Sequence, residues 1–385
     1  MEKKMNLHIM PDNTYSKEFI EFINNNFDKR QHFFCIITNN ENFVHLDNIS
    51  NGNIIKVRIN SGWKKLLSTN NKTIKQFINK SDKIFIHYLS SWAAYYINKY
   101  AKKRRLYWII WGGDLYSYIG IKLYDEETLK IILTSKKKKV TELIKYFIAK
   151  KEQSERKNVI KRLDYICTPF KKDYEVVIQN YNTLAKYSNF IFKMPISMQE
   201  LNTIKNVKEN EYKVILLGNS ADPNNNHVSI LNYLKRYKNF PIKIICPLSY
   251  GNKVYADKVE EIGIKIFGNK FISMRDYISK SEYAQMLSQV DIAIMNQYRQ
   301  QGFGNIIPLL YLGKKIYMNE TSSYSYFIEN GIEINTIKEF LCINDFEVIF
   351  SNEDCPQKQL KNRRILDKLF SDEMRINNYK ELFSY

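Results

Sequence analysis

Short apolar runs alternate with amphipathic stretches along the first half of the sequence. Runs such as FFCIIT at 33–38 and LYWIIW at 106–111 are short and rich in branched and aromatic side chains, which favours strands over buried helices. Strands that alternate with helices in this way form βαβ units around a parallel sheet. The expected strands are 5–10, 33–38, 54–59, 83–87, 106–111, 165–168 and 190–193, and the expected helices are 16–27, 73–79 and 91–100.

A polar stretch at 195–212, which begins with Pro195, separates this half from a second alternation of the same kind. We therefore expect an N-terminal domain at 1–195 and a C-terminal domain at 196–385 that ends in helices. Two such halves predict two Rossmann-like α/β domains that face a cleft, with ligands bound beyond the carboxyl ends of the strands. The expected strands of the second half are 214–217, 242–247, 264–267, 291–295 and 315–318, and the expected helices are 227–238, 253–262, 282–289 (capped by Ser281) and 304–312.

The stretch 124–162 is helical in propensity and very basic, with four lysines at 136–139. The whole chain carries 59 Lys and Arg against 40 Asp and Glu, a formal net charge of +19. This balance favours an anionic partner, such as a nucleic acid, an anionic lipid or a phosphorylated substrate. A general bias of the sequence toward Lys, Asn and Ile explains part of the charge.

The five cysteines are scattered and form no CxxC pair, which predicts reduced thiols in a cytoplasmic protein. The N-terminal residues MEKKMNLHIMPDN lack the apolar stretch of a secretory signal, and no window approaches the 18 apolar residues of a membrane span. If a membrane is involved, we expect the protein to lie on its surface.

Two residues of the first half are candidates for chemistry on a substrate. In WIIWGGDLYSY, an apolar strand runs into two glycines and Asp114, so we expect this carboxylate to be exposed at a strand end as a general base or a hydroxyl ligand. The alternative is that Asp114 caps a helix after the turn. His87 ends the strand 83–87 and could bind or activate an acceptor hydroxyl, although a lone histidine is more often structural.

Residues 214–234, VILLGNSADPNNNHVSILNYL, predict a strand, a polar turn and a helix. Gly218 lets the chain turn, Asn219 and Ser220 offer short polar groups, and Asp222 precedes a proline in a turn. The helix that begins near His227 would point its free N–H groups and its positive dipole end at a bound anion, which suits a diphosphate. The alternative is an asparagine-rich turn without a ligand.

A second strand-to-helix junction lies in DIAIMNQYRQQGFGNIIPLLYLGKKIYMNE at 291–320. Gly302 and Gly304 allow backbone N–H groups to approach an anion, and Arg299 could neutralise a phosphate. Gln300 and Gln301 have no evident packing role beside them, so function is the favoured interpretation. The sequence contains no GxxxxGK[ST], GxGxxG, HExxH or GxSxG motif and no Asp-x-Asp at a strand end, so we expect neither a metal nor a cofactor.

These stretches together resemble the bacterial TDP-Fuc4NAc:lipid II glycosyltransferases of enterobacterial common antigen synthesis, glycosyltransferase family 56. The likeness rests on FIHYLSSW around His87, IWGGDLY at 110–116, LLGNSADPNNNHVSIL at 216–231 and YRQQGFGNIIPLLYLGKKIYMN at 298–319, in matching order from about 5 to 335. It implies the GT-B fold, a nucleotide-sugar donor in the C-terminal domain, and an acceptor saccharide on undecaprenyl diphosphate in the N-terminal domain. GT-B enzymes generally need no metal.

We therefore predict a glycosyltransferase that moves an N-acetylated deoxy sugar, such as Fuc4NAc, from a dTDP-sugar to a lipid-linked saccharide. Acceptors of capsule or O-antigen synthesis are an alternative, and a basic nucleic-acid-binding protein is a lesser one. The stretch 124–162 would lie on the anionic inner face of the cell membrane. The expected catalytic residues are Asp114 and His87, and the expected donor-binding residues are Gly218, Asn219, Ser220, Asp222, His227, Tyr250, Arg299, Gln300, Gln301, Gly302, Gly304 and Asn319.

Overall fold

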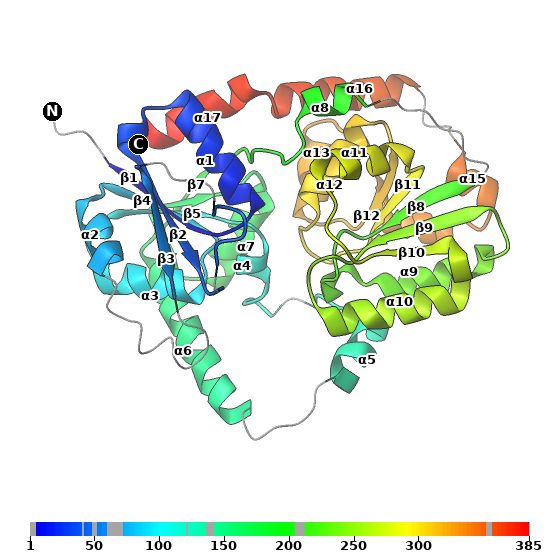
Figure 1. The fold of residues 1–385 in the computed structure, drawn as a ribbon, viewed down its shortest axis with the longest axis horizontal. Coiled ribbons are helices and arrows are strands. Elements are labelled where there is room, and N and C mark those ends of the chain that lie inside the picture. Colours follow the sequence, from blue (N-terminus) through cyan, green and yellow to red (C-terminus); the bar gives the residue numbers. More distant parts are fainter. Residues whose placement is uncertain are drawn as a thin grey trace. The chain divides into compact units, whose positions relative to one another are not determined.

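The computed structural model describes residues 5–40, 42–47, 52–59, 72–120, 122–135, 142–204, 212–351 and 356–384. The chain forms two compact units (Figure 1). The first unit contains Met1–Gly120, Lys139–Pro195 and Asp372–Tyr385, and the second contains Ile121–Lys138 and Ile196–Ser371.

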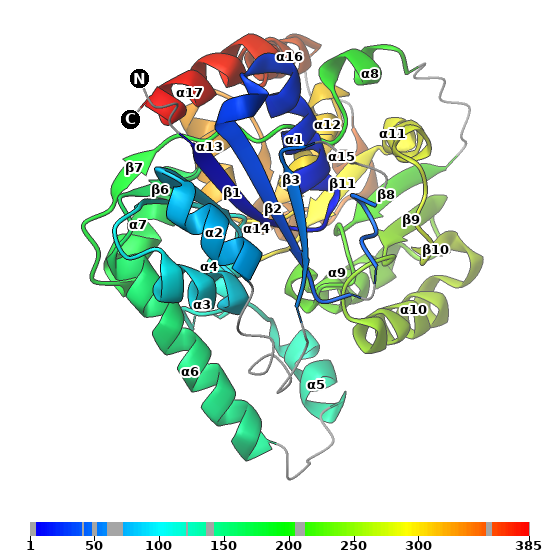
Figure 2. The same ribbon diagram turned by 60° about the vertical axis from the view of Figure 1, so that its left-hand side comes forward.

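The first unit is a seven-stranded parallel sheet of order β3-β2-β1-β4-β5-β6-β7, with helices on both of its faces (Figure 2). Its strands are β1 (Asn6–Pro11), β2 (His32–Thr38), β3 (Ile54–Arg58), β4 (Lys83–His87), β5 (Arg105–Ile109), β6 (Tyr165–Cys167) and β7 (Lys186–Ser188). Its helices are α1 (Thr14–Asn26), α2 (Lys72–Lys80), α3 (Ser91–Tyr100), α4 (Gly113–Tyr116), α6 (Glu142–Lys161), α7 (Lys171–Asn180) and α17 (Asp372–Ser384).

The second unit is a six-stranded parallel sheet of order β10-β9-β8-β11-β12-β13. Its strands are β8 (Lys213–Leu217), β9 (Ile242–Pro247), β10 (Phe271–Met274), β11 (Ile292–Met295), β12 (Lys315–Met318) and β13 (Asn335–Thr336). Its helices are α5 (Glu126–Ser135), α8 (Met198–Asn202), α9 (His227–Leu234), α10 (Lys253–Phe267), α11 (Lys280–Gln289), α12 (Phe303–Tyr311), α13 (Ser322–Glu329), α14 (Ile337–Cys342), α15 (Phe346–Phe350) and α16 (Pro356–Leu369).

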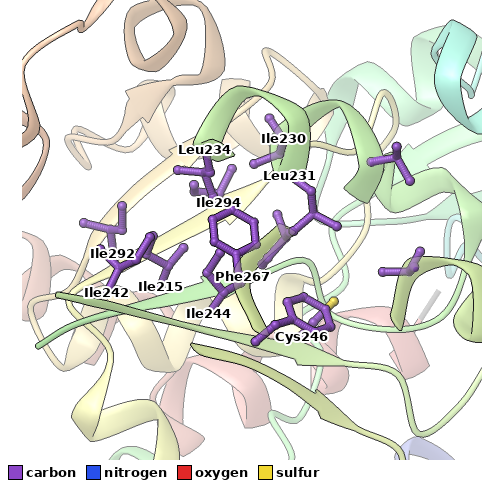
Figure 3. Close-up of a cluster of buried hydrophobic side chains, with 14 of the residues drawn as sticks. Ile215, Ile230, Leu231, Leu234, Ile242, Ile244, Cys246, Phe267, Ile292 and Ile294 are labelled. Atoms are coloured by element: carbon purple, nitrogen blue, oxygen red, sulfur yellow. The ribbon is translucent and has the colours of Figure 1, made fainter. Parts of the chain in front are cut away.

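Apolar side chains of strands and helices meet in the core of the second unit. Isoleucines of β8, β9 and β11, among them Ile215, Ile244 and Ile294, pack against Leu231 of α9 and Phe267 of α10 (Figure 3). These side chains are almost fully buried, so the branched residues that indicated strands in the sequence are the ones that fill the interior. The core fixes the strands, and with them the loops at their carboxyl ends.

Two expected strands are wrong, because each apolar run has another role. Residues 190–193 lie outside any strand, and the ring of Phe190 stacks on Tyr379 of α17 at 5.2 Å. Residues 264–267 continue α10, because Gly263 does not end the helix. The ring of Phe271 packs directly against Gly263, where an added Cβ would lie 2.6 Å from the ring. The expected cap of α11 is also wrong, because Ser279 rather than Ser281 accepts from the backbone N–H of Glu282 in a capping box.

The two units also differ from the expected domains in two segments. Helix α17, expected in the C-terminal domain, belongs to the first unit, where Tyr379 is fully buried and its hydroxyl donates to the carbonyl of Ile191 at 2.7 Å. The basic stretch 124–162 is divided, with α5 in the second unit and α6 in the first. The four lysines at 136–139 lie outside the described residues. Among the helices that the structure describes, none is long and apolar enough to cross a membrane.

Candidate functional site

Most of the expected ligand-binding residues meet at one edge of the second sheet. Strands β9, β8, β11 and β12 are neighbours in that order and run parallel, so the loops that follow them leave from the same edge. The loop after β8 holds residues 218–226, and the loop after β11 holds residues 296–302. In parallel α/β sheets this carboxyl edge is where ligands bind.

The turn after β8 requires a glycine. Gly218 has φ 69°, and a Cβ added to it would lie 2.5 Å from Nε2 of His227 and 2.8 Å from Oδ1 of Asn225. Asp222 then accepts from the backbone N–H of Asn224 at 3.0 Å and caps a short 3₁₀ turn. The turn is therefore held in one shape, with its polar side chains gathered above the strand.

Side-chain amides join the two loops into one group, which we call the amide cluster: Asn219, Ser220, Asn225, Gln297 and Gln301. Nε2 of Gln297 donates to Oδ1 of Asn219 at 3.1 Å and to Oδ1 of Asn225 at 2.7 Å. Nε2 of Gln301 lies 3.3 Å from Oδ1 of Asn219 and 3.4 Å from Oγ of Ser220. Two stretches that are about 80 residues apart in the sequence thus form a single site, as their shared edge predicted.

Arg299 carries a positive charge beside the amide cluster. Its side chain is only 8% exposed. Nη2 pairs with Oδ2 of Asp222 at 3.2 Å, and Nη1 donates to the carbonyl of Gln300 at 2.9 Å. Within the described part of the chain, its Nε has no hydrogen-bond partner. Burying a charged N–H donor without a hydrogen-bond partner costs free energy, so a buried guanidinium with a free N–H is suited to bind an anion.

The helices that begin at the amide cluster have N-cap residues without a side-chain cap, although the first N–H of α9, that of His227, donates to the hydroxyl of Tyr255 at 3.2 Å. The N-caps of α9 and α12 are Asn226 and Gly302, both in left-handed backbone conformation, and neither makes a side-chain cap hydrogen bond to a described residue. In the same unit, α10 and α11 are capped by side chains.

In α12, the N–H groups of Asn305 and Ile306 donate to the carbonyl of Gly302 at 2.8 and 3.0 Å. Within the described residues, the N–H of Gly304 is left for water or a ligand, with the positive end of the helix dipole behind it.

The other expected ligand-binding residues support these loops. His227 is fully buried, its Nδ1 lies 3.2 Å from the hydroxyl of Tyr255, and burial lowers its pKa to about 3, so the ring is neutral. Nδ2 of Asn319, after β12, donates to Oδ1 of Asn296 at 3.0 Å. Gly304 lies in the first turn of α12. His227 therefore acts from beneath the turn rather than on an exposed surface.

Sequence reasoning missed Asn226 and the segment that it holds. Oδ1 of Asn226 accepts from the backbone N–H of Asp125 at 2.9 Å, and Nδ2 donates to the carbonyl of Leu123 at 3.2 Å. Between these two residues, Tyr124 is half-buried, and burial raises its pKa, with Asp222 raising it further and Arg299 opposing. The run of three asparagines was the only signal, and it gave no hint that residues 123–125 belong here.

Asp114 is not the exposed carboxylate that the sequence indicated. It is 0% exposed, and its Oδ2 accepts from Nε1 of Trp108 at 2.7 Å and from the backbone N–H of Leu89 at 2.9 Å. Its Oδ1 accepts from the backbone N–H of Trp111 at 2.9 Å. Burial raises the pKa of Asp114, and the hydrogen bond from Trp108 opposes that shift. The expectation of exposure is wrong, and so is the alternative of a helix cap, because the N-cap of α4 is Gly112 and Asp114 lies within the first turn. The carboxylate instead fixes the turn through the three N–H groups that donate to it.

His87 lies in the interior of the first unit at the end of a chain of histidines. Its Nε2 is 3.2 Å from Nδ1 of His8, and Nε2 of His8 is 3.1 Å from Nδ1 of His32. His87 is 2% exposed and packs on the ring of Phe19 at 4.6 Å. Burial lowers its pKa to about 3. Its surroundings favour the structural alternative.

Comparison with known protein families gives a match to one family. Residues 161–335 match the family described as 4-alpha-L-fucosyltransferase glycosyl transferase group 56. The matched family is one of glycosyltransferases. It is the family that the motifs resemble, so the resemblance is confirmed over these residues, which include the whole amide cluster and Arg299.

Solved structures with the same fold include three proteins of known source. HepE of Anabaena in complex with UDP and glucose has a TM-score of 0.66 at 11% identity and covers 99% of both chains. A glycosyltransferase from Rickettsia africae has a TM-score of 0.64 at 14% identity, over 100% of this chain and 98% of that one. Sucrose-phosphate synthase from Thermosynechococcus elongatus has a TM-score of 0.64 at 9% identity, over 99% of this chain and 98% of that one. The predicted GT-B fold class, with two Rossmann-like domains, is confirmed.

Proposed function

We propose that this protein is a glycosyltransferase whose second unit binds a nucleoside diphosphate sugar at the amide cluster. The observation that carries the proposal is the meeting of Arg299 with the N-termini of α9 and α12 at one sheet edge. A diphosphate is the part of such a donor that needs both positive charge and converging N–H groups. The match of residues 161–335 to a glycosyltransferase family supports the same conclusion.

The chemistry follows from where charge develops. Breaking the bond between the sugar and the diphosphate leaves negative charge on the leaving group, and preorganised donors that face this charge lower the barrier. We assign that task to the backbone N–H groups of α9 and α12 and to the Arg299 guanidinium. The amide cluster orients these groups, since Gln297 and Gln301 hold Asn219 from the opposite loop. Metal independence of the reaction stays a prediction.

For the substrates, we propose a dTDP-linked N-acetylated deoxy sugar, such as Fuc4NAc, as donor and a saccharide on undecaprenyl diphosphate as acceptor. The motifs shared with the matched family support both. The charge of +19 suits work at the anionic inner face of the membrane, where each basic residue near the surface adds about 1 kcal/mol of attraction. Lys157 and Lys161 of α6 are exposed and available for it. An acceptor of capsule or O-antigen synthesis is the alternative.

Thermal unfolding with dTDP, UDP and GDP tests the donor site. A ligand at 100 times its dissociation constant stabilises by about 2.7 kcal/mol, which corresponds to roughly 5–10 °C for a domain of this size. We expect dTDP to give the largest shift. If none of the three nucleotides raises the melting temperature, the donor-site proposal is refuted.

Arg299→Ala tests the assigned charge partner. A hydrogen-bonded charge contributes about 1.5–3 kcal/mol, so the variant should bind the nucleotide about 10- to 150-fold more weakly. Arg236→Ala is the matched control, because Arg236 belongs to the same unit but donates to Asn344 and stacks on Tyr233. Equal nucleotide affinity of the Arg299 and Arg236 variants would remove Arg299 from the site.

A further inference from the structure

We propose that Tyr250 is the platform on which the nucleobase of the donor stacks. This inference rests on the proposed function and adds the direction in which the donor lies. Tyr250 follows β9, the strand next to β8, so it leaves the sheet at the same edge as the amide cluster.

The two ends of the Tyr250 side chain have different surroundings. The residue is 62% exposed. Its hydroxyl, in contrast, accepts from Nδ2 of Asn219 at 3.1 Å and is hydrogen-bonded to Ser220 as well. Burial of the hydroxyl raises the pKa of Tyr250. The residue therefore presents its ring outward while its polar end is tied into the amide cluster.

The backbone around Tyr250 is equally fixed. The N–H of Ala221 donates to the carbonyl of Tyr250 at 2.8 Å, and the N–H of Asn252 donates to the carbonyl of Ala221 at 3.1 Å. Gly251 has φ 120°, and a Cβ there would lie 2.6 Å from the carbonyl carbon of Ala221. A ring held at both ends loses little conformational freedom when a ligand covers it, which is how a rigid aromatic side chain contributes to affinity.

The most exposed apolar side chains at the carboxyl edge of the second sheet lie toward one end of that edge. Tyr250, Val254 and Tyr277, which follow β9 and β10, are 62%, 54% and 75% exposed, whereas the exposed aromatic residue after β11, Tyr298, is only 37% exposed. On the other side, β11 and β12 are followed by the linked amides of Asn296 and Asn319. A nucleoside diphosphate sugar has a flat base at one end and a hydroxyl-rich sugar at the other. The base matches the aromatic end, because every base offers a π-face for stacking, and the sugar matches the amide end.

Titration calorimetry on Tyr250→Ala tests the inference with the nucleotides UDP and dTDP, with UDP-glucose and with inorganic diphosphate as probes. Loss of one base–aromatic stack should raise the dissociation constants of both nucleotides about 5- to 150-fold and leave that of diphosphate unchanged. Tyr250→Phe, which keeps the ring, should stay within a few-fold of the wild type. Phe240→Ala is the matched control: Phe240 is 40% exposed and precedes β9, at the opposite edge of the sheet.

The possible outcomes separate this inference from the proposed function. Unchanged nucleotide affinity in Tyr250→Ala overturns the stacking role alone, and so does an equal loss for diphosphate, which would indicate a damaged loop. If Tyr250→Ala weakens a UDP-sugar but not UDP, the ring contacts the sugar and the assigned direction is wrong. If the wild-type protein binds none of the nucleotides, the proposed donor site itself falls, and the platform with it.

Discussion

Acidification should unfold the first unit through its buried histidines. His32, His8 and His87 lie on β2, β1 and β4 and form one hydrogen-bonded chain, with N···N distances of 3.1 and 3.2 Å. Burial lowers the pKa of His8 well below 6.5, that of His32 to about 4 and that of His87 to about 3. Asp28 raises and Lys83 lowers the pKa of His32, but neither outweighs burial. All three rings are thus neutral in the folded state.

The direction in which the stability changes with pH follows from proton binding. Below pH 6.5 the unfolded chain takes up a proton on each of these histidines and the folded unit does not, so stability is complete above pH 6.5 and is lost as the pH falls toward about 4. Each histidine contributes about 1.4 kcal/mol per pH unit. The three together should therefore lower the free energy of unfolding by about 6 kcal/mol near pH 5, a large part of the roughly 5–15 kcal/mol of a typical domain.

Tryptophan fluorescence during urea unfolding measures this effect in the first unit alone. The four tryptophans of the chain, at 63, 92, 108 and 111, all belong to that unit. His8→Phe suits the site, because His8 already stacks between Phe34 and Phe85 at 5.1 and 4.9 Å. The variant should reduce the slope of unfolding free energy against pH by about a third, that is, by about 1.4 kcal/mol per pH unit.

The absolute stability of His8→Phe is not the readout, since the change also removes two hydrogen bonds. His45→Gln serves as the control, because His45 is an exposed histidine of the same unit. Its slope should equal that of the wild type. An unchanged slope in His8→Phe, or a wild-type slope no steeper than one proton between pH 6.5 and 5, would refute the account of three neutral buried rings.

Three further substitutions test other parts of the structure. Gly218→Ala should destabilise the second unit by about 2 kcal/mol or more and abolish nucleotide binding, because the added Cβ would lie 2.5 Å from Nε2 of His227. Gly268→Ala is the control: Gly268 has φ 58° and an added Cβ would have no atom within 4 Å, so a calorimetric scan should show a loss of only about 1 kcal/mol. Asp114→Asn should lower the unfolding free energy of the first unit by about 1–3 kcal/mol, because the new amide N–H₂ would face an N–H donor. Nucleotide affinity measured by calorimetry should stay constant, and unaltered stability would contradict the role of Asp114 in the turn. Tyr379→Phe should lower the urea midpoint by the equivalent of about 1 kcal/mol, and no change would show that its hydrogen bond to Ile191 is dispensable.

Most strands could be predicted from the sequence because parallel strands are buried on both faces and read as apolar runs. The same rule explains the failures. Phe190 is as apolar as a strand residue, yet its ring packs on Tyr379 of α17, about 190 residues away in the sequence. Gly263 has the appearance of a helix end, and only the ring of Phe271 against it shows that the helix continues. Local pattern cannot reveal a partner that tertiary structure supplies.

The candidate site was predictable to a similar extent. Strand-to-helix junctions with glycine indicated both loops, because backbone freedom at Gly218 and Gly302 leaves a trace in the sequence. The role of Gln297 left none, and the run of three asparagines did not show what Asn226 binds, since an amide that joins two segments looks like any polar residue. For Asp114, the sequence showed a strand end and could not show that Trp108 and Leu89 would enclose the carboxylate.

The placement of α17 in the first unit has a consequence for how the protein is made. Domains generally fold in order as they leave the ribosome, the N-terminal one first. Here the first unit lacks Tyr379 and Leu382, both buried in its core, until the whole second unit has been synthesised. The nascent chain must therefore carry an incomplete N-terminal unit throughout the synthesis of the second, and a truncation before Asp372 would damage the part of the protein that was made first.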